Sequence, residues 1–157
     1  VVHAADNAWP EWYEFNRMIG LGGWGDRDES DGPYVYYNTD GELVRDTSPG
    51  RAGSHGPQHE ILITLREEHP ITKGMEDFEI SDETYRNKYH PDFQLHSLVH
   101  MDRGDEQQSM AWALEPGKGR MFNTTLGHGD RAWTNPHFQR LVVRGLYWVA
   151  GREPKGP

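Results

Sequence analysis

The chain has 157 residues, enough for one domain with a core of its own. Its net charge of −9 argues against nucleic acid or an anionic membrane surface as a partner. The absence of cysteine excludes disulfides, thiolate nucleophiles and cysteine-ligated metals. Nine histidines, six tryptophans and seven tyrosines would suit a small polar ligand, although a loop-rich domain with surface histidines has the same composition.

The first residues are typical of a buried strand that ends in a loop. Val1 and Val2 are apolar, and the segment H-A-A-D follows at residues 3–6. A buried parallel strand needs a neighbour on each side. We therefore expect residues of the same fold to precede Val1, so that the single domain of residues 1–157 is incomplete at its N-terminus. A short edge strand is the alternative.

A helix is predicted over residues 10–20. Pro10 suits its first turn and Gly20 its C-terminal end. Its apolar stripe comprises Trp12, Phe15, Met18 and Ile19. The glycine-rich loop that follows, residues 20–33, lacks the spacing of a phosphate-binding loop. Within it, Trp24 either packs against the protein or stacks on a substrate.

The middle of the chain is predicted to consist of strands. The Asp-Gly turn at residues 40–41 favours a hairpin. The predicted strands cover residues 34–37, 43–45, 60–65, 93–101 and 109–114. His55 and His59 are four residues apart, but Gly-Pro between them excludes a helix, so we expect His55 to be functional and His59 structural. The acidic residues before Tyr85 have the composition of a solvated surface.

The C-terminal part of the chain carries the clearest pattern. A strand is predicted over residues 120–126 and a helix after it, with Asn135 as N-cap, Pro136 at the first position and Gly151 beyond the end. The stripe predicted to face the core comprises Phe138, Leu141, Val142, Gly145, Leu146 and Val149.

The loop between this strand and this helix, residues 127–133, has the composition of a site. It offers an imidazole, a carboxylate, a guanidinium and an indole, and its two glycines allow sharp bends. In open α/β sheets, ligands bind at the carboxyl ends of strands. His128 is the leading candidate for catalysis, and Asp130 could orient its ring. The alternative is that His128 caps the next helix or bonds a loop carbonyl.

Six short motifs follow one another along the chain. They are H-A-A-D (residues 3–6), G-S-H-G (53–56), H-P-I-T-K-G (69–74), D-E-T-Y (82–85), G-K-G-R-M-F (117–122) and T-L-G-H-G-D-R-A-W-T-N-P-H-F (125–138). In this order they resemble the ThuA (trehalose utilisation) family, and the chain resembles the C-terminal part of that family's domain. The resemblance implies a class I glutamine amidotransferase-like α/β fold. Such a fold is a flavodoxin-like three-layer structure with a parallel core sheet, here with N-terminal strands missing and with hairpin and loop insertions.

The implied fold also limits the chemistry. Glutamine amidotransferases place a cysteine at the sharp turn after a central strand, where this chain has His3. Their later His-x-Glu pair corresponds to His128 and Asp130. Because the chain has no cysteine, hydrolysis of glutamine is excluded.

The resemblance places the candidate site residues in loops near one edge of the sheet. Catalytic roles are expected for His128, Asp130, Glu83 and His3. Substrate contacts are expected from Asp6, Trp24, His55, Tyr85, Arg131 and Trp133. A divalent metal of the zinc or manganese type would be held by His3, His55 and His128. No nucleotide cofactor is expected.

The family's link to sugar catabolism implies an enzyme that acts on a 3-keto glycoside or a disaccharide such as a trehalose derivative. A ketone at C3 acidifies the C2 proton, so acid/base catalysis, with or without a metal, could isomerise the sugar or release its C1 substituent. A non-catalytic carbohydrate-binding or scaffolding domain of a larger enzyme is the alternative. The expected partners are a small sugar, a missing N-terminal segment or chain, or a second copy of the chain. The bacterial cytoplasm and periplasm both fit the sequence.

Overall fold

The computed structural model describes residues 1–9, 12–23, 34–38, 40, 42–46, 54–66, 68–86, 88–89, 96–103 and 106–154. Its strands are β1 (Leu21–Gly23), β2 (Tyr34–Tyr37), β3 (Leu43–Asp46), β4 (Ser54–His55), β5 (His59–Leu65), β6 (Phe78–Asp82), β7 (Tyr85–Arg86), β8 (Lys88–Tyr89), β9 (His96–Arg103), β10 (Glu106–Leu114) and β11 (Met121–Thr124). Its helices are the 3₁₀ helix η1 (His3–Asn7), α1 (Tyr13–Ile19), α2 (Asp130–Trp133) and α3 (Pro136–Val149).

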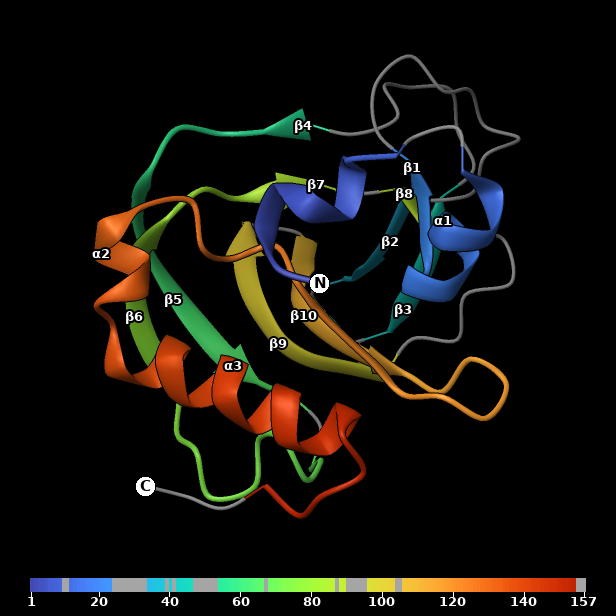
Figure 1. The fold of residues 1–157 in the computed structure, drawn as a ribbon. Coiled ribbons are helices and arrows are strands. Elements are labelled where there is room, and N and C mark those ends of the chain that lie inside the picture. The colour runs from blue at the N-terminus through green and yellow to red at the C-terminus, as the bar shows by residue number, and fades with distance from the viewer. Residues whose placement is uncertain are drawn as a thin grey trace.

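One large sheet organises these elements (Figure 1). Its strands follow the order β1-β8-β2-β10-β9-β5-β6, and β11 joins β10 while β3 joins β2. Strand β10 lies in the middle of the sheet. It pairs with β9 on one edge, and on the other edge first with β2 and then with β11. Strands β4 and β7 form a separate two-stranded sheet.

The described strand pairs are all antiparallel, so the predicted parallel core sheet and flavodoxin-like layering are not found among them. The reason is connectivity. Neighbours such as β9 and β10, or β10 and β11, follow each other directly in the chain, and short connections join only antiparallel strands. A single parallel contact is described, the isolated bridge between Val2 and Thr124. The mixed α/β composition is as predicted.

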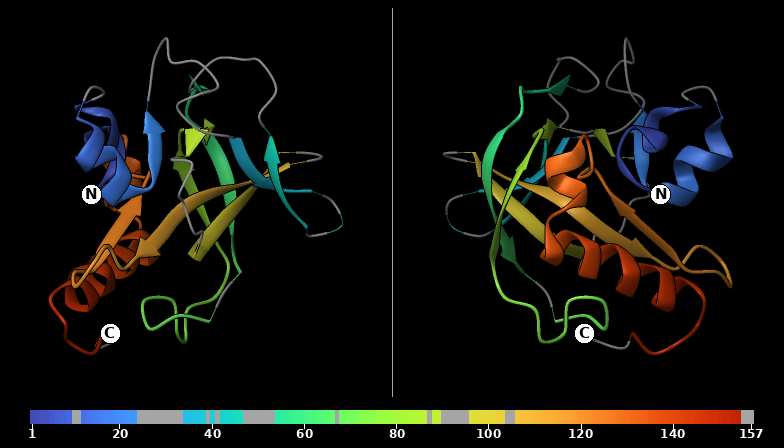
Figure 2. Two further views of the ribbon diagram at one scale, coloured as in Figure 1. Left: turned by 90° about the vertical axis from the view of Figure 1, so that its right-hand side faces the viewer. Right: turned by 60° about the vertical axis from the view of Figure 1, so that its left-hand side comes forward.

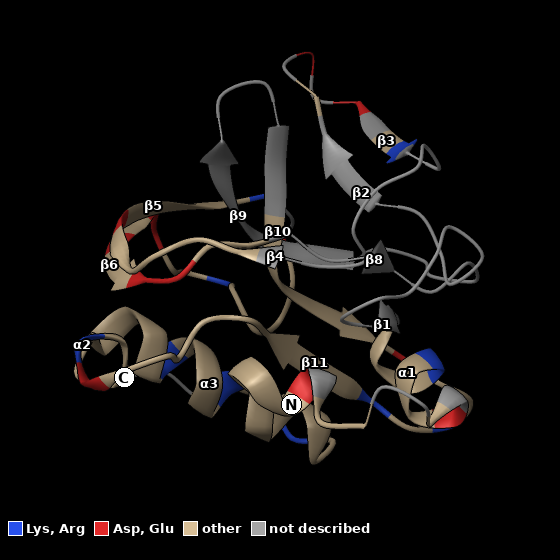
Figure 3. Ribbon diagram, turned by 90° about the horizontal axis from the view of Figure 1, so that it is seen from above, with Lys and Arg blue, Asp and Glu red and all other residues tan. Residues whose placement is uncertain are grey.

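The sheet buries one face against α2 and α3 (Figure 2). In β5, Ile61 and Ile63 are buried while Leu62 is 52% exposed, as expected for a strand with one solvated face. The same alternation in β6 buries three positions, the last of which is Asp82. Figure 3 shows acidic positions on β5 and β6 and basic positions on α3. Because β6 alternates buried and less buried positions, it places the carboxylate of Asp82 inside the protein at the end of the strand.

Helix α3 confirms the predicted caps. The Asn135 side chain accepts hydrogen bonds from the backbone N–H groups of His137 and Phe138, at 2.9 and 3.1 Å. Beyond the helix, Gly151 has φ +69°, the left-handed conformation that favours glycine.

The core-facing stripe of α3 differs in part from the prediction. Leu146 and Val149 were expected in the core but are 64% and 42% exposed. Arg144 and Trp148 are buried instead. The Arg144 guanidinium donates to two backbone carbonyls of the turn that follows β5, and Trp148 lies 5.0 Å from the ring of His69. That turn packs against the helix. Its carbonyl groups accept hydrogen bonds from the arginine, which explains an arginine at a core-facing position.

Helix α1 ends at Gly20 as predicted, with φ +79°, but it begins at Tyr13 and buries only part of its apolar stripe. Ile19 is buried, whereas Trp12 and Met18 are 49% and 42% exposed. The helix lies at one end of the sheet, where Ile19 packs with Trp112. Phe15 is partly buried against the same two residues, so the helix covers a narrow surface at this edge with only part of its stripe.

The other predicted strands are largely confirmed. The hairpin forms between β2 and β3, and the segments predicted over residues 60–65, 109–114 and 120–126 correspond to β5, β10 and β11. The part of the prediction over residues 93–101 that precedes β9 lies outside the described residues. No described helix has both the length and the apolar character that crossing a bilayer requires.

The packing of α3 on β11 generates a prediction at Gly145. A Cβ atom there would lie 2.4 Å from the Phe122 ring, too close for any real contact. We expect Gly145→Ala to destabilise the protein by ~1–3 kcal/mol, because overpacking outweighs the ~1 kcal/mol gained in helix propensity. Urea unfolding measures the loss. Val143→Ala, at an exposed position of the same helix, is the control and should change stability by less than ~0.5 kcal/mol. A Gly145→Ala protein as stable as wild type would contradict the described packing.

Candidate functional site

A buried carboxylate fixes the loop that follows β11. Asp82 accepts three backbone N–H groups: from Gly127 at 2.6 Å, from His128 at 3.1 Å and from Glu83 at 2.8 Å. Its side chain is fully buried, so these bonds replace the water that the carboxylate loses on folding. Asp82 thus ties the end of β6 to the start of the loop and sets the positions of Glu83 and His128 together.

The loop passes very close to the N-terminal segment at Gly127. This residue has φ +118°, and a Cβ atom on it would lie 3.2 Å from the Phe138 ring and 3.3 Å from Val2. Both observations require glycine at this position. The close approach brings the neighbouring residue, His128, to within reach of His3.

His3 occupies a strained backbone conformation. It is the one non-glycine residue with positive φ in the described part of the chain, at +52°. Such a conformation costs on the order of 1–3 kcal/mol and is concentrated at functional sites. His3 Nδ1 lies 2.9 Å from the carbonyl oxygen of Thr125, which can only accept. Neutral His3 therefore carries its proton on Nδ1, and its Nε2 has a free electron pair.

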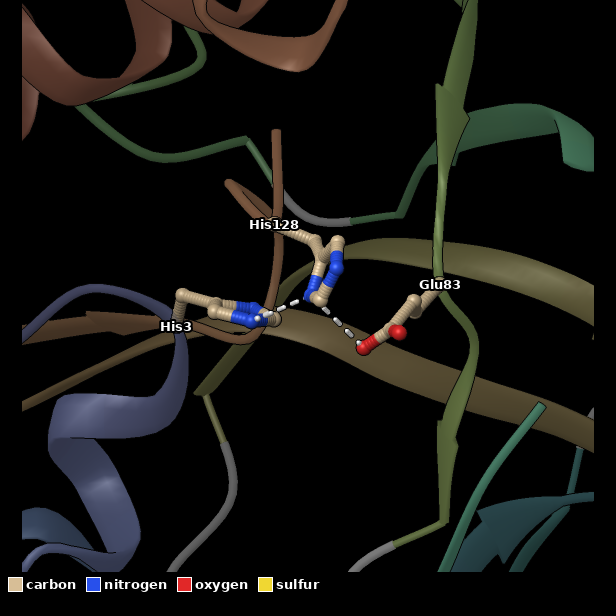
Figure 4. Close-up of side chains that lie close together, drawn as sticks. All are labelled: His3, Glu83 and His128. Atoms are coloured by element: carbon tan, nitrogen blue, oxygen red, sulfur yellow. Dashed lines mark hydrogen bonds and ion pairs between the residues drawn. The ribbon is translucent and has the colours of Figure 1, made fainter. Parts of the chain in front are cut away.

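Two imidazoles and a carboxylate meet at one point (Figure 4). His128 Nδ1 lies 3.1 Å from His3 Nε2 and 3.1 Å from Glu83 Oε2. One ligand atom of each residue lies within 4.8 Å of the other two. The three residues come from η1, from the segment after β6 and from the loop after β11, so the fold and not local sequence assembles the cluster.

Tyr85 and His55 border this cluster. The Tyr85 hydroxyl lies 3.3 Å from His3 Nε2, and its ring is 5.8 Å from that of His55. Burial, and secondarily the charge of Glu83, raise the pKa of Tyr85, so that its hydroxyl stays protonated as a donor. His55 Nδ1 lies 3.7 Å from Glu83 Oε1, on the far oxygen of that carboxylate. His55 is therefore near the cluster but does not share its meeting point.

Asp6 lies on the same 3₁₀ helix as His3 and is 2% exposed. Burial raises the pKa of Asp6 to about 7, although the Asn123 side chain and the N-terminal charge act in the opposite direction. An ordinary aspartate is ionised at neutral pH, whereas the protonated and the ionised forms of Asp6 are both populated there. Its burial leaves little of it accessible to a substrate.

The remaining predicted site residues lie farther from the meeting point or outside the described part. Asp130 and Arg131 are exposed in α2, and the carboxylate that contacts His128 belongs to Glu83 and not to Asp130. Trp133 is 45% exposed, and its indole N–H donates to the Gly127 carbonyl at 3.0 Å. Trp24 lies outside the described residues.

Sequence reasoning missed Asp82. By itself the acidic pair at residues 82–83 has the composition of a solvated surface, and the resemblance pointed to Glu83 alone, yet both residues are buried. A signal was present. Asp82 lies two positions after Ile80 and four positions after Phe78, so it shares their face of the strand. An acid in phase with a buried apolar face indicates a specific partner inside the protein.

The elevated pKa of Asp6 predicts a pH dependence of stability. Its folded-state pKa of about 7 exceeds the ordinary 3.8, so the folded state holds the proton more tightly and stability falls as pH rises from about 4 to about 7. The Asp6→Asn variant has no carboxyl group to titrate at this position, so it should not lose stability in this way. The variant should gain stability relative to wild type across that window, by on the order of 2–4 kcal/mol, with no further change above it.

Urea unfolding at pH 4, 6 and 8 tests this expectation. Asp40→Asn, at an exposed aspartate, is the control and should follow wild type at each pH. If the difference between Asp6→Asn and wild type is the same at pH 4 and pH 8, the proton affinity assigned to Asp6 is wrong.

The comparisons with known proteins agree with the resemblance seen in the sequence. A model of the ThuA family, described as trehalose utilisation, matches residues 1–149. A crystal structure of a ThuA-like protein from Parabacteroides merdae is 37% identical, with a TM-score of 0.87 over 99% of this chain and 61% of that one. A ThuA-like protein from Bacteroides uniformis is 20% identical, with a TM-score of 0.57 over 99% of this chain and 59% of that one, and it supports the fold alone.

The chain spans about three fifths of the length of these two proteins. A search of curated proteins found no match. The family model covers nearly the whole chain, and the Parabacteroides protein is well above 30% identical over almost all of it. The chain belongs to the ThuA (trehalose utilisation) family.

Proposed function

We propose that the chain carries the reaction centre of an enzyme that acts on a carbohydrate, with a 3-keto glycoside as substrate. The observation that carries the proposal is the convergence of His3, Glu83 and His128 at one partly open point. The family's description as trehalose utilisation supports a sugar as the substrate class.

His128 is the group best placed to accept a proton from a substrate. Its side chain is 44% exposed, while that of Glu83 is only 9% exposed. The buried carboxylate can therefore stabilise an imidazolium without competing for the substrate. His3 lies within hydrogen-bond distance of His128, and Tyr85 within hydrogen-bond distance of His3, so a proton can pass along these groups.

The chemistry of a 3-keto glycoside suits such a centre. The base takes the C2 proton, and the electron pair of that bond forms an enolate with the C3 ketone. The enolate then expels the C1 oxygen, which takes up a proton, or it is protonated again to give an isomer. Tyr85 is 4% exposed and would act through His3, since its protonated hydroxyl can donate to His3 Nε2.

Carbohydrate binding without turnover is the second candidate. Trp9 and Trp12 are 53% and 49% exposed and lie together with Phe15, and Trp133 is 45% exposed. Flat aromatic faces of this kind can stack on sugars. This candidate explains the exposed rings but leaves the strained backbone of His3 without a role.

Exchange of the C2 proton of a 3-keto glycoside with deuterated water, followed by NMR, separates the two candidates. We expect wild type to catalyse the exchange, and His128→Ala and Glu83→Gln to reduce its rate by ~10²-fold or more. His59→Ala changes an exposed histidine outside the cluster and should exchange at the wild-type rate. Binding of the sugar without exchange would support the non-catalytic candidate, and full exchange by His128→Ala would contradict the role of His128.

A further inference from the structure

We infer that His3, Glu83 and His128 hold a divalent metal ion of the zinc type, with Glu83 in place of His55 as the third ligand. This inference concerns the same centre as the proposed function, and only its catalytic consequence rests on that function. The donor set of two imidazoles and one carboxylate is one that catalytic zinc sites use.

The distances fit such an ion. Bonds of ~2.0–2.1 Å in a tetrahedral arrangement place neighbouring ligand atoms about 3.3 Å apart. In the structure, His128 Nδ1 is 3.1 Å from His3 Nε2 and 3.1 Å from Glu83 Oε2. One ligand atom of each of the three residues lies within 4.8 Å of the other two. Small side-chain rotations would suffice to admit the ion.

The electron pairs directed at this point can also bind a cation. The Thr125 carbonyl fixes the proton of neutral His3 on Nδ1, which leaves Nε2 with an electron pair directed at His128. His128 Nδ1 can carry one proton at most, yet it faces two acceptors, His3 Nε2 and Glu83 Oε2. The Tyr85 hydroxyl can donate to His3 Nε2 and the His128 proton can go to Glu83 Oε2, whereas a divalent ion would engage all three ligand atoms at once.

The surroundings resemble those of known metal ligands. A ligating histidine usually donates its other ring N–H to a carbonyl or carboxylate, as His3 does to Thr125. The buried carboxylates of Asp82 and Glu83 add negative charge that offsets the cost of holding an ion. His55 Nδ1 lies 3.2 Å from the Gly56 carbonyl and 3.7 Å from the second oxygen of Glu83, so it does not face the meeting point as a ligand would.

An ion held by these three residues would leave a fourth position open to water or a sugar oxygen. With the ion bound, His128 would serve as a ligand instead of as the proton acceptor, and the ion would supply that acceptor by lowering the pKa of a bound water to near neutrality. Each of the three residues would act as a ligand, and the exposed side of His128 would define the entrance for the substrate.

Calorimetric titration of zinc into chelator-treated protein tests the inference without any substrate. Wild type should bind one ion, with an affinity that weakens as pH falls through the imidazole range. Glu83→Gln and His3→Ala should each lose ~10²-fold or more in affinity, since even residues beyond the ligands contribute ~10–100-fold. His59→Ala is the control and should bind as wild type does. Thermal melts confirm that each variant is folded.

His55→Ala distinguishes the two possible ligand sets. We expect it to lose far less affinity than Glu83→Gln, and an equal or larger loss would overturn the assignment of Glu83. Failure of folded wild type to bind zinc at a single site would overturn the inference altogether. C2 exchange by metal-free protein at the full rate would overturn the catalytic consequence of the metal site while leaving the proposed function intact. Zinc binding without any exchange would leave the metal site intact and contradict the proposed function.

Discussion

The three hydrogen bonds accepted by Asp82 are the constraint on which the rest of the site depends. Bonds to a charged group contribute ~1.5–3 kcal/mol each, so together they exceed the ~1–3 kcal/mol of strain assigned to His3. Because the same carboxylate binds the backbone of Glu83 and of His128, these two side chains are placed relative to each other before any ligand arrives. The site is therefore preorganised by a residue that takes no part in its chemistry.

The charge distribution around this anchor explains why the centre suits a cation or a mobile proton. Asp6, Asp82 and Glu83 are all buried, and Glu83 contacts His128 directly. The charges of all three act on Tyr85, which borders the two imidazoles. Part of the negative charge is neutralised by protonation, because burial raises the pKa of Asp6 to about 7. The carboxylate of Asp82 is satisfied by backbone N–H groups, which leaves Glu83 as the carboxylate that faces the imidazoles. The arrangement concentrates basic atoms at one point and keeps the tyrosine beside them protonated.

Local features of the fold were predictable from the sequence, and long-range ones were not. Asn135, Pro136 and Gly151 define α3 because caps act over a few residues. The parallel core sheet implied by the resemblance is not confirmed among the described strand pairs, because strand partners depend on connections that short motifs do not report. His3, Glu83 and His128 were all named as candidates from motifs, but their meeting point required the contact of three distant segments. The sequence grouped His55 with His3 and His128, because nothing in the sequence shows that Glu83 contacts His128 directly.

The central claim is that His3, Glu83 and His128 form one coupled centre, and the nitrogen NMR signals of the imidazole rings test it most directly. We predict that neutral His3 carries its proton on Nδ1 and that Glu83→Gln shifts the ring signals of both His3 and His128, while those of His59 stay in place. A neutral His3 protonated on Nε2, or ring signals of His3 and His128 that do not respond to Glu83→Gln, would contradict the account.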